Sequence, residues 1–112
     1  MGYCHFHKQG EVYLGGGMCI DSRAYRRLPA DSRREIRRGG GIAYQVLKYA
    51  VGQLDDCAAV FGYVGDRRAE SVDLKVGFRH TGVPHLIVMW KRKLDERRKQ
   101  EIIREIAEVG PF

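Results

Sequence analysis

The sequence predicts an α+β fold, and three patterns lead to that prediction. Polar and apolar residues alternate near the N-terminus, as in strands; an apolar stripe at steps of three and four follows, as in a helix; and both patterns recur toward the C-terminus. We expect residues 1–112 to form a single small domain, because this length supports one hydrophobic core. The predicted order is an N-terminal β-hairpin, short arginine-rich helices and one core helix, a three-stranded antiparallel meander, and a C-terminal helix packed on one face of the sheet.

The N-terminal hairpin is predicted from the first fourteen residues. Side chains alternate along Tyr3–Lys8, Gln9-Gly10 supplies a turn, and Glu11–Leu14 has the composition of a returning strand. A two-residue loop at this turn sets Lys8 opposite Glu11, with an ion pair at the tip. Three consecutive glycines after Leu14 then break the pattern, so we expect the second strand to end there.

Three helices are predicted between residues 21 and 54. A short helix opens at Asp21-Ser22 and ends before Pro29, because proline disfavours helical backbone at the residue that precedes it. Ser32 and Glu35 have the spacing of a capping box, so a second short helix is expected to start there and to end at three glycines. The core helix is expected over Ile42–Leu54, whose apolar residues form one stripe.

Three strands and a helix complete the predicted fold. Residues 55–61 also fit the stripe of the core helix, but their β-type composition favours a strand over 57–64. Apolar and polar residues alternate along Val72–Phe78, which indicates a strand with one solvated face. Leu86–Trp90 is apolar on both faces, as in a central, covered strand. The last helix is expected over Asp95–Val109.

Composition excludes several classes of protein. A hydrophobic fraction of 44% is too high for a disordered chain, and no apolar run approaches the roughly 18 residues of a membrane span. Three cysteines are an odd number at wide spacings, which does not form a disulfide framework. No signal pattern opens the chain. We therefore expect a basic, soluble, cytoplasmic protein with no membrane partner and no cofactor.

The positive charge is concentrated in one segment. The chain carries 20 Lys and Arg against 14 Asp and Glu, a net charge of +6. Between Asp21 and Gly41 lie seven arginines, no lysine and three acidic residues, a local excess of four. The planar guanidinium suits bidentate phosphate contacts and stacking on bases. Ile36 is nearly the only apolar residue of the second short helix, so packing contributes little to it.

This charge pattern predicts a protein that binds a nucleic-acid backbone. No base-reading motif is present, so RNA and DNA both remain open as partners. A second basic concentration, at residues 91–93, lies at a strand–helix junction. The residues expected to contact nucleic acid are the basic side chains of the first segment, of two later elements and of this junction: Arg23, Arg26, Arg27, Arg33, Arg34, Arg37, Arg38, Lys75, Arg79, Lys91, Arg92 and Lys93. Aromatic residues could stack on bases, although their strand and helix spacing favours the core.

Two other classes of function stay open. One is a protein-binding inhibitor or accessory factor whose arginines pair with an acidic partner; homodimerisation is also left open. The other is an enzyme. His80 and His85 flank a turn and, with Arg79, Lys75 and Arg92, have the chemistry to cleave RNA through its 2′-hydroxyl.

A metal site is the weaker alternative for the histidines. His5 and His7 share a strand face, near Cys4, and could reach one ion with a third ligand from His80, His85 or Cys19. No pair has the short spacing of a closed structural site, so no metal is expected.

Two segments resemble known families. The order of arginine-rich helices, three-strand meander and basic strand end, together with Ala24–Arg38 (AYRRLPADSRREIRR), resembles the small RelE-type toxins, which implies a metal-independent endoribonuclease. The chain departs from them in its N-terminal hairpin and in lacking their arginine–tyrosine signature. Pro84–Val88 followed by Ile102–Ile106 is similar to the opening strand and helix of the tautomerase superfamily. Those enzymes use an N-terminal proline amine, whereas Pro84 is internal.

Overall fold

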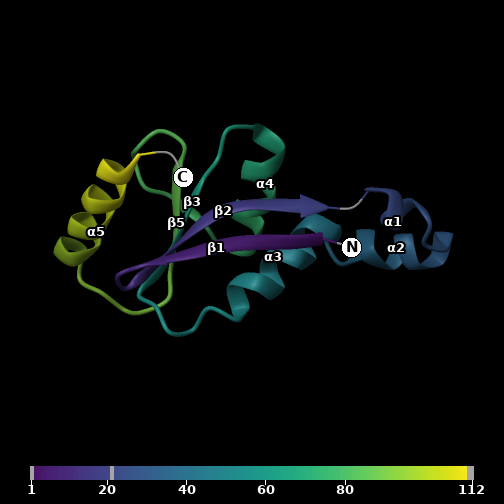
Figure 1. Ribbon diagram of the computed structural model, residues 1–112, viewed down its shortest axis with the longest axis horizontal. Coiled ribbons are helices and arrows are strands. Elements are labelled where there is room, and N and C mark those ends of the chain that lie inside the picture. Colours follow the sequence, from purple (N-terminus) through teal and green to yellow (C-terminus); the bar gives the residue numbers. More distant parts are fainter. Residues whose placement is uncertain (1, 21, 111–112) are drawn as a thin grey trace.

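The computed structural model describes the backbone of residues 2–20 and 22–110 and the side chains of residues 4–15 and 23–110. Within these residues it has a five-stranded sheet and five helices (Figure 1). The strands are β1 (Gly2–Gln9), β2 (Val12–Ile20), β3 (Ala59–Tyr63), β4 (Arg79–His80) and β5 (Leu86–Trp90). The helices are α1 (Ser22–Arg26), α2 (Ala30–Arg38), α3 (Ile42–Gly52), α4 (Arg67–Val76) and α5 (Glu96–Val109).

The sheet is mixed, with strand order β1-β2-β3-β5-β4. β2 and β3 are parallel, and the other neighbours are antiparallel. A parallel pair needs a long crossover, and α1, α2 and α3 supply it. The α+β class is confirmed, but the predicted three-stranded antiparallel meander is wrong.

The meander fails at residues 72–78, which we predicted as a strand. Most of that segment belongs to α4, whose N-terminus is capped by Asp66: its Oδ1 accepts a hydrogen bond from the Ala69 backbone N–H at 2.8 Å. The alternating apolar residues also fit steps of three and four from Ala69, so a short window satisfied both periods. Leu74, which alternation places in the core, is 39% exposed.

The hairpin is confirmed, but its register differs from the prediction. The turn lies at Gly10-Glu11, where Gly10 has φ +60°, and Lys8 lies opposite Tyr13 rather than Glu11. Both charges find distant partners instead of each other. Lys8 Nζ lies 2.9 Å from Asp56 Oδ2, and Glu11 pairs with Arg98. The three glycines do not end β2, which continues to Ile20.

The remaining elements follow the predictions with one further correction. The core helix, the strand after it, the covered strand and the C-terminal helix all form as α3, β3, β5 and α5. The capping box at Ser32 and Glu35 is wrong: α2 begins at Ala30 after Pro29, without a side-chain cap. Proline suits the start of a helix because its fixed φ is already near the helical value, so the helix begins two residues earlier.

The core lies on both faces of the sheet. On one face, Phe61 and Val88 pack against Ile102 and its neighbours from α5. On the other face, Val60 and Ile87 pack against α3 and α4, through residues such as Leu47. The expected placement of the C-terminal helix on one face therefore holds, but helices cover the opposite face as well.

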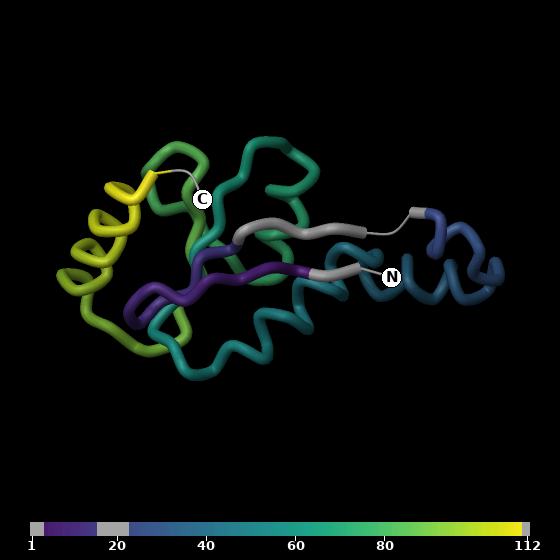
Figure 2. The backbone as a smooth tube through the Cα atoms, viewed as in Figure 1, coloured from purple at the N-terminus to yellow at the C-terminus, as the bar shows by residue number. Residues whose placement is uncertain are grey.

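The molecule is elongated, with extents of 49 × 24 × 20 Å. The sheet, α4 and α5 form the body, and α1 and α2 lie together at the far end of the long axis (Figures 1 and 2). α2 has no buried residue. The arginine-rich segment is therefore set apart from the hydrophobic core.

Candidate functional site

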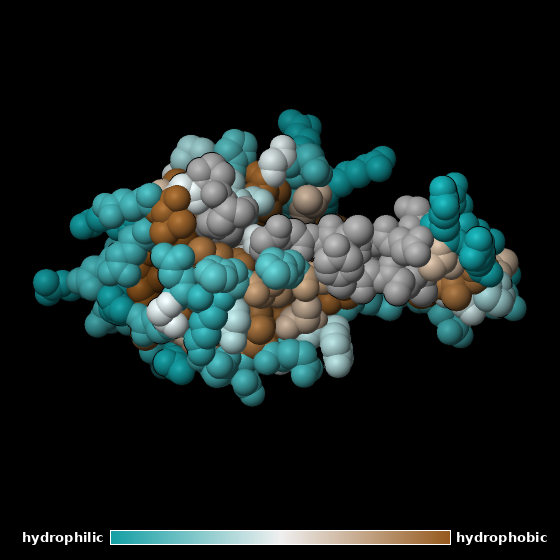
Figure 3. Space-filling view, viewed as in Figure 1, coloured by the Kyte–Doolittle hydropathy of each residue, from teal (hydrophilic) through white to brown (hydrophobic). Residues whose placement is uncertain are grey.

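The arginine-rich segment forms one end of the molecule. Hydrophilic side chains extend from this end in the space-filling view (Figure 3). Arg33 is half-buried, and the other arginines of the segment are exposed: Arg23, Arg26, Arg27, Arg34, Arg37 and Arg38. The structure thus brings seven predicted nucleic-acid contacts together on two short helices.

These arginines differ in what they already contact. Arg34 Nη2 lies 2.7 Å from Asp31 Oδ1, one helical turn earlier. Arg37 and Arg38 have no ion pair among the described residues. The Nε of Arg33 is buried and has no hydrogen-bond partner in the described part of the chain. A buried donor without an acceptor is unfavourable, so an anion that reached Arg33 would satisfy it.

The second basic cluster, residues 91–93, is not part of this surface. Lys91 Nζ donates to the Val51 carbonyl oxygen at 2.6 Å, at the C-terminal end of α3. Such a lysine stabilises free carbonyls of the last helical turn. Because α3 runs about 16 Å from its start near α2, Lys91, Arg92 and Lys93 are separated from the arginine-rich end.

The candidate catalytic histidines lie at the other end of β5 from Arg92. His80 Nε2 is 3.1 Å from Glu70 Oε1 of α4. His85 Nδ1 donates to the Val64 carbonyl oxygen at 2.8 Å, and its backbone has φ 67°. Since a carbonyl only accepts, Nε2 of neutral His85 is left as the proton acceptor.

The structure does not assemble the full set of residues proposed for RNA cleavage. Arg79 and His80 form β4, and Lys75 is exposed near the end of α4, in the same part of the body. Arg92 donates its backbone N–H to Ala58, before β3 begins, whereas His85 contacts Val64 after β3 ends. The element order that resembles RelE-type toxins is also absent, because the middle strand of the meander is α4.

The histidines of β1 do not gather metal ligands in the described residues. His5 and His7 are exposed, while Cys4 and Phe6 are half-buried, so the predicted alternation of faces is confirmed. Cys4 therefore points away from both histidines. The Cys19 side chain lies outside the described residues, and the described ones contain no group of three His, Cys, Asp or Glu that could hold an ion.

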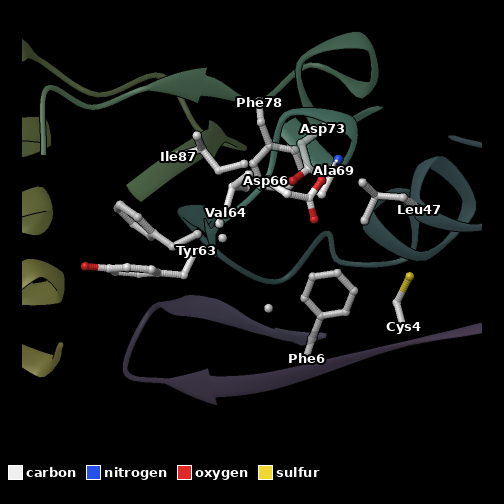
Figure 4. A pocket seen from close by; sticks show the side chains of 14 residues that line it. Cys4, Phe6, Leu47, Tyr63, Val64, Asp66, Ala69, Asp73, Phe78 and Ile87 are labelled. Atoms are coloured by element: carbon white, nitrogen blue, oxygen red, sulfur yellow. Dashed lines mark hydrogen bonds between the residues drawn. The ribbon is translucent and has the colours of Figure 1, made fainter. Parts of the chain in front are cut away.

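A pocket that sequence reasoning missed lies where β2 and β3 stop pairing. The two strands are paired from Val12–Leu14 to Ala59–Phe61, and no further pair joins them among the described residues. Beyond this point lies a pocket of about 290 Å³. Its walls come from both strands, β1, α3, α4 and β5, and Figure 4 shows Cys4 and Phe6 opposite Asp66 and Asp73.

Asp73 gives this pocket acid–base character. Burial, and secondarily the charge of Asp66, raises the pKa of Asp73 from 3.8 to about 6. A carboxyl group that titrates near neutrality can take up or release a proton in a reaction. Burial, with a smaller effect of Asp73, raises the pKa of the Cys4 thiol, which keeps it protonated and a poor nucleophile.

The raised pKa of Asp73 predicts a pH-dependent stability. Its protonated form is favoured in the folded state, so this contribution is fully present below pH 3.8 and is lost as the pH rises through about 6. We expect the free energy of unfolding of the wild type, relative to Asp73→Asn, to fall between pH 4 and pH 7. Urea unfolding of both proteins across this range measures the difference. A difference that does not change with pH would contradict the assignment.

Comparison with protein-family models, with curated proteins and with solved structures finds no match for this chain. Within the described residues, no helix has the length and apolar character needed to cross a bilayer. The functional argument therefore depends on the arginine-rich end and on the pocket beside Asp73.

Proposed function

We propose that the protein binds the phosphate backbone of a nucleic acid through the arginine-rich end. The observation that carries the proposal is that α2 buries no residue and yet presents five-ninths of its length as charged arginine-rich surface beyond the body. A helix that gains so little from core packing is more readily explained by what it contacts outside the molecule. Phosphate is the anion that the guanidinium fork matches best.

Two further features support a phosphate ligand at this end. Arg37 and Arg38 have no acidic partner in the described residues, so binding would not first break an ion pair. The N-terminus of α3 follows directly: its cap is Gly41, without a side-chain hydrogen bond, and its first turn has no acidic residue. Free backbone N–H groups at a helix start favour an anion.

The proposal is tested by measuring the affinity of the full chain for labelled RNA and DNA at two salt concentrations. Each phosphate that is neutralised adds about 0.7 to 0.9 to the slope of log affinity against log salt. We expect binding at low salt that falls steeply as salt is added. Absence of binding at low salt, or a flat response, would contradict the proposal and leave an acidic protein as the partner to be sought.

The pocket favours a second candidate function, the binding of an extended small molecule. Where β2 and β3 stop pairing, backbone groups on their facing edges have no ladder partner among the described residues. An extended chain with amide groups could pair with those edges as an added strand does. Asp73 lies in the same pocket with a proton to exchange near neutral pH.

A coenzyme A thioester has the chemistry that fits both parts of this site. Its pantetheine arm is an extended chain with two amides, and its phosphates suit the uncapped start of α3, which lies about 8 Å along the helix from Leu47 in the pocket wall. We infer that the second candidate is acyl-group binding or transfer, with Asp73 as the acid or base.

Calorimetry with coenzyme A and acetyl-coenzyme A tests this candidate. A side chain at Gly65, which lines the pocket, starts in open space, so Gly65→Leu should fill the pocket and weaken binding without a clash. Arg104→Ala, on the exposed face of α5, serves as the matched control. No heat of binding with the wild type, or equal binding by Gly65→Leu, would rule out the pocket as the site.

A further inference from the structure

The outer face of α3 carries an aromatic groove that continues from the arginine-rich end. It is lined by Tyr44, Gln45, Lys48 and Tyr49, with Gly39 and Gly52 at its ends. Tyr49 is 72% exposed, the largest exposed fraction among the large hydrophobic side chains of the described residues. An exposed aromatic ring has a free face, and the expectation that helical spacing places these tyrosines in the core does not hold for Tyr49.

The groove is both aromatic and cationic. Lys48 Nζ lies 5.5 Å from the centre of the Tyr44 ring, so a positive charge is held over an aromatic face. α3 contains no acidic residue, and the groove begins at Gly39, directly after Arg37 and Arg38. Gln45 ties α3 to α2, because its Nε2 donates to the Ile36 carbonyl oxygen at 3.1 Å. The aromatic rings are therefore fixed beside the arginines.

We propose that this groove receives unpaired bases, so that the nucleic acid is single-stranded. The inference rests on the proposed function, and names the form of nucleic acid that the arginine-rich end binds. Single strands are bound by a positive surface that follows the phosphates and by aromatic side chains on which bases stack. In a duplex the bases are stacked on one another, and their faces are not available to Tyr49.

The test compares a single-stranded RNA with a duplex of the same sequence, using the wild type, Tyr49→Ala and Tyr49→Phe. We expect tighter binding of the single strand by the wild type. Tyr49→Ala should weaken that binding about 5- to 100-fold and leave duplex binding and the salt slope unchanged, because no charge is lost. Tyr49→Phe keeps the ring and should restore the affinity. Leu74→Ala, another exposed apolar residue, is the control.

The outcomes separate this inference from the proposed function. If the wild type binds nucleic acid but Tyr49→Ala binds the single strand equally well, the groove is not a stacking site and the phosphate surface still stands. If the wild type forms a concentration-dependent dimer that Tyr49→Ala disrupts, the groove is a contact between copies and the inference is overturned. If the wild type binds neither form, the proposed function fails and the inference fails with it.

Discussion

Replacing Arg37 and Arg38 together with alanine is expected to weaken nucleic-acid binding about 10- to 100-fold at low salt. Both side chains are exposed and have no ion pair among the described residues, so the substitution removes charge only from the ligand. The salt slope should fall by about 1.5 to 2, one contact for each arginine. Fluorescence anisotropy with a labelled oligonucleotide at several salt concentrations measures both quantities.

Arg34→Ala is the matched control, because Arg34 already pairs with Asp31. We expect it to change the affinity less than either neighbour does. Circular dichroism should show an unchanged helix content in all variants, because α2 has no buried residue to lose. Equal losses from Arg34→Ala and from the double variant would mean that only the total charge matters. No loss from the double variant would place the binding surface elsewhere.

Phe61→Ala is expected to lower the free energy of unfolding by about 3 to 5 kcal/mol. Phe61 has no solvent exposure and lies at the centre of the sheet, where its ring meets Trp90 edge to face with centroids 6.0 Å apart. Its loss leaves a cavity between β3 and α5 and removes the aromatic contact. Urea unfolding monitored by Trp90 fluorescence measures the change.

Phe61→Leu keeps most of the volume and should cost less than half as much. If the alanine variant is too unstable to fold, the leucine variant still tests the packing. A loss below about 1 kcal/mol in Phe61→Ala would contradict the placement of this ring in a close-packed core.

Elements with one clear pattern were predictable from the sequence. The stripe of α3, the apolar run of β5 and the capped, amphipathic α5 each fit one period only. α4 was not predictable in this way, because over ten residues its apolar positions satisfy both periods and only the cap at Asp66 distinguishes them. The hairpin register failed for a local reason: Gly10 can take φ +60° at the first turn position as easily as at the second.

The candidate site was predictable in part. Seven arginines in one segment are visible in the sequence, and contiguous residues on two short helices must lie near each other. The pocket was not visible, because its walls come from elements whose neighbours are set by the sheet order β1-β2-β3-β5-β4. Asp73 illustrates the difficulty: the predicted strand placed it on a solvated face, whereas in α4 it is half-buried against the sheet.

The most direct test of the arginine-rich end is to observe its guanidinium groups while nucleic acid is added. We would follow the Nε–Hε NMR signals of the arginines during titration with a single-stranded oligonucleotide. We predict saturable shifts for Arg33, Arg37 and Arg38 and none for Arg97 or Arg104 on α5. Shifts confined to α5, or equal small shifts at every arginine, would contradict the claim that this end is the nucleic-acid-binding surface.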